Sequence, residues 1–274
     1  MKLKELPVSL YKEMVLSWVS PRKIVSPEAK VLPVIVSLTT IESRLSIVHL
    51  AVRSILTQKS IPSKVVLWLN VSLEEKIPHS LRELETSGRF ECRFTVEDCP
   101  HVKLIPSLLE FPDATVVTCD DDAMYRSGWL ERIYATSLKY PGAVVSNRLR
   151  TIVYDKNKEL LPYRKWIYTP SQKWQFQLPI GAEGVLYPSG CFAKEVTDFH
   201  LALKLAPKAD DLWFKALSLV NETPCVLTEN PVKESIPIRN SQKISLKKTN
   251  IRQDRNRLQW LDLTAYFQLD KLLK

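Results

Sequence analysis

Three consecutive aspartates, Asp120, Asp121 and Asp122, directly follow an apolar stretch at 114–118. Adjacent carboxylates repel one another, so such a run is typical of a cation site or of a solvated acidic turn. Along an extended chain Asp120 and Asp122 point to one side and Asp121 to the other. Paired oxygen ligands of this kind suit a hard divalent ion. The apolar stretch before them reads as a buried strand, and this favours the cation site over the acidic turn.

The elements around these aspartates alternate between β-type and helical patterns. The expected strands and helices of the first half are 33–38, 43–57, 64–70, 73–87, 89–97, 103–110, 114–118, 128–140 and 143–146, beginning with a strand. This alternation predicts an α/β fold, an α/β/α sandwich with a mostly parallel central sheet. Ligands of such sheets bind at the carboxyl ends of the strands, where the aspartates lie. The second half is less regular, with helices expected at 210–220 and 258–273.

Composition excludes several classes of protein. The 274 residues include 6 glycines, and neither GxGxxG nor GxxxxGK[ST] occurs, so a dinucleotide-binding Rossmann site and a P-loop are not expected. The 5 cysteines are scattered without a CxxC pair, which argues against a disulfide scaffold or a structural zinc site. No apolar run approaches the roughly 20 residues that cross a bilayer. These features favour a cytoplasmic protein.

Positive charge is concentrated near the C-terminus. The net charge is +9, and residues 239–257 hold seven Lys or Arg side chains against one acid, Asp254. Three interpretations remain open for this segment: a solvated surface, a contact with a donor diphosphate, or docking on the anionic face of a membrane.

Several segments resemble those of GT-A nucleotide-sugar glycosyltransferases, especially family-2-like bacterial enzymes of surface polysaccharide synthesis. VVTCDDDAMYRSGWL resembles their Asp-x-Asp region, and PVIVSLTTIESRLSIVHLAVRSIL resembles their first strand and helix. HVKLIPSLLEFPDATVVTCDDD resembles the stretch that closes over the base. GAEGVLYP, from Gly181, and ADDLW, from Ala209, resemble the acceptor loop and the late acidic motif. The segments occur in the family's order over about 33–220, and imply a GT-A type, Rossmann-like sandwich.

The resemblance implies roles for individual residues at the donor. Asp120 would face the ribose or the metal, and Asp122 would bind Mn²⁺ or Mg²⁺ directly. The cation would neutralise the leaving diphosphate. The remaining residues that we expect to contact the nucleotide sugar are Thr39, Arg44, Lys103 and Asp121. Many GT-A enzymes add a late histidine as a metal ligand, but none follows His200 here, so water is a candidate third ligand.

The late acidic pair, Asp210 and Asp211, is the predicted catalytic group. Both acids lie at the start of the expected helix 210–220, where the helix dipole favours negative charge. A helix cap explains one acid and hardly explains two. In an inverting transferase a carboxylate takes the proton of the attacking hydroxyl group. We expect Asp211 to be this base and Asp210 to bind the acceptor or cap the helix, although the roles could be exchanged.

Acceptor binding is expected around the loop that begins at Gly181. Gly181 and Gly184 would allow close approach of the backbone to a ligand, with a simple turn as the alternative. Aromatic faces stack on sugar rings, and this suggests Tyr187, Trp213, Trp166 and Trp174 as acceptor contacts, although each aromatic is individually more often part of a core.

Together these features predict a metal-dependent glycosyltransferase. It would transfer a sugar from a nucleotide donor, with a UDP-sugar favoured, to a saccharide or lipid-linked saccharide acceptor in surface polysaccharide or glycan biosynthesis, by inversion. The expected divisions are a lead-in at 1–32, a transferase domain at 33–230 and a basic segment with a helix at 231–274. Contact with the inner membrane face would occur through that segment, and nucleic acid is not the expected partner. Two alternatives remain: a two-metal phosphoryl-transfer enzyme or nuclease using Asp120, Asp122, Asp210 and Asp211, and a non-catalytic carbohydrate-binding protein with a GT-A fold.

Overall fold

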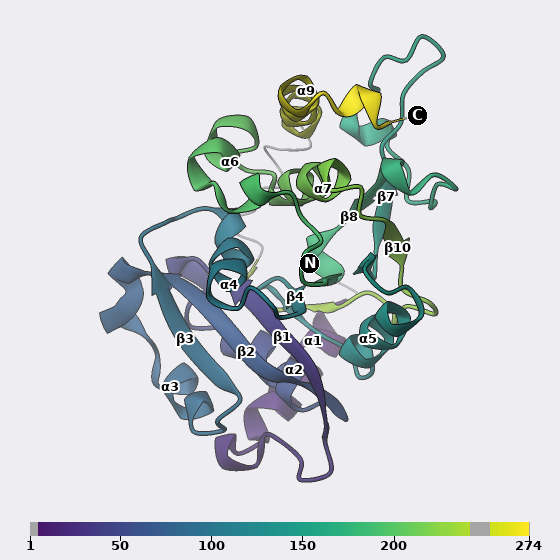
Figure 1. The fold of residues 1–274 in the computed structure, drawn as a ribbon. Helices are drawn as coiled ribbons and strands as arrows, with labels where there is room; N and C mark the ends of the chain where they lie inside the picture. Colours follow the sequence, from purple (N-terminus) through teal and green to yellow (C-terminus); the bar gives the residue numbers. More distant parts are fainter. Residues whose placement is uncertain (1–4, 242–252, 274) are drawn as a thin grey trace.

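The computed structural model describes residues 5–241 and 253–273 and is built on a central seven-stranded sheet (Figure 1). The strands lie in the order β10-β6-β9-β4-β1-β2-β3. Their bounds are β1 Lys30–Thr39, β2 Ser60–Asn70, β3 Phe90–Thr95, β4 Val116–Thr118, β6 Val144–Ser146, β9 Val185–Tyr187 and β10 Cys225–Leu227. β9 runs antiparallel to both neighbours, and the other pairings are parallel. The predicted α/β fold with a mostly parallel sheet is thus confirmed.

The strands of this sheet are apolar because both of its faces are covered. Val36 and Leu38 of β1 belong to the core cluster on one face of the sheet. Ile35, which points to the opposite face, packs with Trp68 of β2 in another cluster. Val117 and Val116 of β4 divide between clusters in the same way. Side chains of a strand alternate between faces, so a continuous apolar run is needed where neither face meets water.

Helices form the outer layers. Their bounds are α1 Leu6–Trp18, α2 His49–Leu56, α3 His79–Glu85, α4 Ile105–Glu110, α5 Trp129–Lys139, α6 Phe199–Leu205, α7 Asp210–Val220 and α9 Arg255–Phe267. In Figure 1, α4 lies over one face of the sheet and α2 over the other. Helix α7 packs beside β8, and α9 packs on α7. The sheet therefore forms the middle layer of a sandwich.

Two short sheets supplement the central one. β5, Ala123–Met124, pairs with β11, Ile236–Pro237, and β7, Leu149–Thr151, pairs with β8, Gln177–Pro179. The first of these pairs begins immediately after the three aspartates. It joins the end of β4 to a segment that is distant in the sequence, and so holds the aspartates from their C-terminal side.

Several expected boundaries differ from the structure. The helix expected at 73–87 is a 3-10 helix, Val71–Lys76, followed by α3, because Pro78 between them lacks the N–H that a continuous helix needs. The helix expected at 43–57 is likewise a 3-10 turn, Glu42–Arg44, followed by α2. Strands β9 and β10 were not expected, because residues 181–188 were read as an acceptor loop and the apolar residues of β10 lie in the irregular second half.

The terminal segments are part of the same cores as the centre of the chain. Leu16 and Ile24, from the expected lead-in, and Ile236 lie in the core cluster of β1. Trp260 and Leu263 of α9 lie in the cluster of α7. The divisions expected at 32 and 230 therefore do not separate independent cores within the described residues. In residues 5–241 and 253–273, no helix combines the length and the apolar character that crossing a membrane requires.

Candidate active site

The three aspartates lie at the carboxyl end of β4, beside the carboxyl end of β1. These two strands are parallel neighbours, with Ser37 opposite Thr118. The residues that follow them, Thr40 after β1 and Asp120–122 after β4, therefore meet at one edge of the sheet. This is the edge at which ligands bind in open α/β sheets.

Asp121 is the buried member of the three. Its carboxylate accepts hydrogen bonds from the Thr40 hydroxyl group and from Arg44 Nη1, the latter at 2.6 Å. Burial raises the pKa of Asp121, while Arg44 and the Thr40 bond oppose this rise. Arg44 also lies 3.7 Å from Asp122 Oδ2 and donates to the Ser241 carbonyl group. Arg44 thus holds two of the aspartates and the segment after β11 together.

Lys103 joins the first aspartate to the late acidic pair. Its Nζ lies 2.8 Å from Asp120 Oδ1 and 3.0 Å from Asp210 Oδ2. Burial opposes the charge of Lys103, but the carboxylates of Asp120, Asp210 and Asp211 outweigh it and hold the lysine pKa well above its usual value. The lysine is therefore a permanent cation between two segments that the sequence separates.

Asp211 rests on the backbone of the loop that carries Gly181. Both of its carboxylate oxygens accept from the Gly181 N–H, at 3.1 and 3.2 Å. A Cβ at Gly181 would lie 2.7 Å from Asp211 Oδ1, so only glycine permits this contact. Burial and the neighbouring Asp210 raise the pKa of Asp211, and Lys103 partly offsets them. The result is a carboxylate with strong affinity for a proton, as a general base requires.

The structure brings most of the expected catalytic and donor residues together. Contacts connect the late acidic pair, Lys103, Arg44, the three aspartates and Gly181 in one site. Asp120 is held by Lys103, however, whereas Asp121 and Asp122 both approach Arg44. The simple alternation expected for the three aspartates is therefore altered, because the chain leaves the strand at Cys119 and turns before β5.

Four expected residues have other surroundings. The Thr39 hydroxyl group donates to the Trp68 carbonyl group, and Thr40 contacts the aspartates instead. Tyr187 and Trp213 are buried in the core around α7, and the indole N–H of Trp213 donates to the Val196 carbonyl group. Their burial leaves no aromatic face for a sugar, so we do not retain them as acceptor contacts. Trp166, buried in the same core, is not retained either.

Gly184 has a structural role that the acceptor hypothesis did not include. Its φ is +98°, and an added Cβ would lie 2.6 Å from Cζ2 of Trp129. The indole N–H of Trp129 in turn donates to the Glu183 carbonyl group. The glycine therefore permits the Trp129 ring to pack beneath the loop that carries Gly181.

This role predicts a large loss of stability for Gly184→Ala. We expect the free energy of unfolding to fall by about 2–4 kcal/mol, because backbone strain adds to a steric clash in a packed core. Urea unfolding followed by tryptophan fluorescence measures the loss. Gly190→Ala is the matched control, since Gly190 has a φ of +72° but open space around its Cα. Equal losses in the two variants would contradict the packing role.

Three further residues support the site, and sequence reasoning missed them. Tyr125 is buried, accepts from the Asp120 N–H and donates to the Ala182 carbonyl group, so it joins the aspartates to the Gly181 loop. Thr40 was overlooked beside Thr39. His101 packs edge-on against Trp213 and Phe214, and burial lowers its pKa to about 4. The only sequence signal for these residues was proximity to Asp120, Thr39 and Lys103.

A divalent cation would take few ligands from this chain. Among the described residues, no group of three or more His, Cys, Asp and Glu side chains is arranged to hold a metal ion. Asp120 and Asp122 are partly exposed, however, and Mg²⁺ commonly binds one or two carboxylates together with substrate phosphates. Among the described residues, Asp120, Asp121, Asp122 and Asp210 contact two cations, Lys103 and Arg44, so carboxylates outnumber cations there. The residues thus fit a divalent ion shared with phosphate oxygens.

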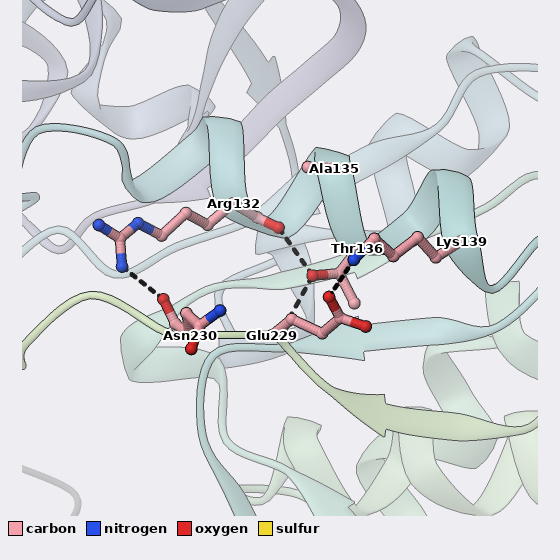
Figure 2. A pocket seen from close by; sticks show the side chains of 6 residues that line it. All are labelled: Arg132, Ala135, Thr136, Lys139, Glu229 and Asn230. Carbon is pink, nitrogen blue, oxygen red and sulfur yellow. Dashed lines mark hydrogen bonds and ion pairs between the residues drawn. The ribbon is translucent and has the colours of Figure 1, made fainter.

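Two surface hollows lie outside this site. The first, of about 360 Å³, lies between α5 and the chain after β10 (Figure 2) and is lined by Arg132, Ala135, Thr136, Lys139, Glu229 and Asn230. Its walls bond to one another: Lys139 pairs with Glu229, and Arg132 donates to the Asn230 carbonyl group. The second lies at α6 and α9. Neither contains a residue of the candidate site.

No model of a protein family matches the sequence, and no curated protein matches it. Among solved structures, the chain is similar to the crystal structure of 4-diphosphocytidyl-2C-methyl-D-erythritol synthase from Anaerococcus prevotii DSM 20548. The TM-score is 0.48 at 13% identity, over 85% of this chain and 97% of that chain. At this level the likeness assigns neither a family nor a reaction.

Proposed function

We propose that the protein is a glycosyltransferase of GT-A type that transfers a sugar from a nucleotide donor, favoured as a UDP-sugar, to a saccharide or lipid-linked saccharide acceptor. The setting would be surface polysaccharide or glycan biosynthesis. One observation carries the proposal: Lys103 joins Asp120, at the end of β4, to Asp210, which begins α7 beside the candidate base Asp211. A donor-binding carboxylate run and a candidate base thereby share one site.

The donor diphosphate would lie against Asp120, Asp122, Lys103 and Arg44. Asp120 and Asp122 would hold Mn²⁺ or Mg²⁺, which when bound supplies positive charge to the phosphate oxygens of the leaving group. Lys103 and Arg44 provide cationic groups at the same place, and Arg44 presents a planar guanidinium that matches phosphate oxygens. Asp121 positions Arg44 through their 2.6 Å contact rather than binding the donor directly.

Asp211 would act on the acceptor. Its carboxylate takes the proton of the acceptor hydroxyl group while the hydroxyl oxygen forms a bond to the anomeric carbon. The bond between that carbon and the phosphate oxygen breaks, and the nucleoside diphosphate leaves with the electron pair. The raised pKa of Asp211 suits it to hold the proton. Attack opposite the leaving group would invert the anomeric configuration.

The metal role predicts that Asp122→Asn loses metal-dependent nucleotide binding. UDP with Mn²⁺ should stabilise the parent protein by about 2.7 kcal/mol at a hundredfold excess over the dissociation constant, measured as a thermal shift. EDTA should abolish the shift, and Asp122→Asn should reduce it strongly because one of two chain ligands is lost. Asp113→Asn, an exposed aspartate before β4, is the matched control and should retain the shift.

Two results would overturn parts of this proposal. A full shift in Asp122→Asn would contradict the metal role, and UDP-sugar binding without turnover on any saccharide acceptor would favour the non-catalytic alternative. The two-metal nuclease alternative needs carboxylates that share two cations. It has less support, because Lys103 lies between Asp120 and Asp210, where such a cation would bind.

A further inference from the structure

Helix α1 presents an apolar surface to the outside of the molecule. Six residues, which we call the α1 apolar face, are exposed: Val8, Leu10, Tyr11, Met14, Val15 and Trp18. Trp18 is 82% exposed and Tyr11 65%. A surface helix normally turns its apolar side chains toward the core and its polar ones toward water. Here that arrangement is largely reversed, and a contiguous apolar surface of this kind marks an interaction site.

Two polar side chains of α1, Ser9 and Glu13, face the protein. The Ser9 hydroxyl group is buried and is 2.8 Å from the Pro237 carbonyl oxygen, to which it donates. Glu13 accepts from Ser9 and from the Arg239 N–H. These bonds attach the helix to β11 and the residue pair after it. The helix therefore cannot rotate its apolar face inward without breaking buried polar contacts, which is costly.

The C-terminal end of α1 is held as well. Arg53, buried on α2, donates from Nη1 to the carbonyl groups of Leu16 and Val19, at 3.0 and 2.7 Å. A cation at the C-terminus of a helix satisfies its last carbonyl groups and its dipole. Leu16 is the buried anchor of the same turn. Both ends of the helix are thus fixed, with Trp18 pointing away from the core.

We propose that α1 is an interfacial helix that docks the protein on an anionic lipid bilayer. Tryptophan and tyrosine prefer the boundary between headgroups and acyl chains, and aliphatic residues beside them would enter the acyl region. Cations outnumber acids beside the apolar face: Lys12 flanks it, Arg22 and Lys23 follow it, Glu5 precedes it, and Glu13 turns inward to Arg239. This balance suits anionic headgroups. An isolated interfacial helix turns its polar face to water, whereas the corresponding face of α1 packs against the rest of the protein.

The docking helix lies next to the candidate site. β11, to which Ser9 bonds, pairs with β5 immediately after the aspartates. The Ile238 N–H donates to the Asp122 carbonyl group, and Ser241 accepts from Arg44. A bilayer held by α1 would therefore lie one short strand pair from the site, which suits a lipid-linked acceptor. The docking itself does not depend on the proposed transfer reaction.

Vesicle flotation tests this inference on the full chain. The parent protein should float with vesicles of phosphatidylcholine mixed with phosphatidylglycerol and much less with phosphatidylcholine alone. The triple variant Tyr11→Ser, Met14→Ser, Trp18→Ser should bind the mixed vesicles at least about tenfold more weakly, because it removes the largest side chains of the face. Arg22→Gln with Lys23→Gln should weaken binding to mixed vesicles and reduce its salt dependence.

A matched control keeps the test specific. The double variant Val96→Ser, Leu138→Ser removes two exposed apolar side chains away from α1. Val96, just after β3, is 77% exposed, and Leu138 on α5 is 63% exposed. Vesicle binding by this variant should equal that of the parent. Circular dichroism establishes that each variant is folded, and the UDP thermal shift, measured without lipid, reports the candidate site separately. Unchanged vesicle binding by the triple variant would overturn the inference. The inference would also be overturned if the parent protein did not bind vesicles but formed a dimer in sedimentation, and the triple variant did not form that dimer.

Discussion

Replacing Asp211 by asparagine should reduce the turnover number of sugar transfer by about 10²–10⁴-fold, because a general base is lost. Asparagine keeps the size of the side chain and can still accept from the Gly181 N–H, which the aspartate now contacts at 3.1 Å. The donor should therefore bind normally. A loss of turnover with an unchanged UDP thermal shift would separate proton transfer from donor binding.

The same variant should be more stable than the parent at neutral pH. The pKa of Asp211 is raised in the folded protein, chiefly by burial and then by Asp210. Between the usual carboxyl pKa of 3.8 and the raised value, the folded state binds more protons than the unfolded state, so the stability of the parent falls as pH rises. Asparagine does not titrate, so its advantage should grow over that range and be absent below it.

Urea unfolding of both proteins at pH 5 and pH 8 measures this difference. The free energy of unfolding of Asp211→Asn should exceed that of the parent by more at pH 8 than at pH 5. Asp198→Asn is the control, since Asp198 caps α6 by accepting from the Leu201 N–H and lies outside the site. A parent and an Asp211→Asn variant whose stabilities change in parallel with pH would show that Asp211 has an ordinary pKa. It would then be poorly suited as a base.

Lys103→Met should destabilise the fold by about 3–5 kcal/mol, because it removes one partner of a buried charge network. The lysine side chain is only 11% exposed, and its ammonium group contacts both Asp120 and Asp210. Methionine fills a similar volume but leaves these carboxylates close together without a cation. Their mutual repulsion and desolvation would then act unopposed.

Lys64→Met provides the matched comparison. Lys64 pairs with Glu91 at 2.8 Å, the same distance as Lys103 with Asp120, but its side chain is 36% exposed. Exposed ion pairs contribute about 0–1 kcal/mol, so this variant should unfold nearly like the parent. Adding Asp210→Asn to Lys103→Met should recover part of the loss. Similar unfolding midpoints for the two methionine variants would refute a buried network at Lys103.

Residue patterns alone predicted the α/β fold and most strands of the first half. The strands β1, β2 and β4 were recognisable because they are buried on both faces and so carry unbroken apolar runs. Helix α7 was predicted with both its ends, since its apolar periodicity follows directly on two acids. β4 and β6 have only three residues each but lie within the regular alternation of the first half, whereas β9 falls in a segment read as an acceptor loop and β10 in the irregular second half.

The candidate site was predicted in part for the same reason. Asp120–122 were found because an acidic run after a buried strand is a local signal, and Asp210–211 because they precede a clear helix. Tyr187 and Trp213 were assigned to an acceptor from residue type and from the resemblance of GAEGVLYP and ADDLW to segments of the family. Residue type does not distinguish an aromatic that lines a site from one that packs in a core, and both are buried. The expected cations at 243–252 lie outside the described residues.

What the sequence determined by itself was local: which segments are strands or helices, and which acids stand at their ends. Backbone preference and apolar periodicity act over a few residues, so they can be read directly. Only the tertiary structure decided that Arg44 reaches Ser241, 197 residues away, that Lys103 joins two acidic segments, and that α1 turns its apolar side outward. These contacts depend on how distant segments pack, and packing is a property of the whole fold rather than of any one stretch.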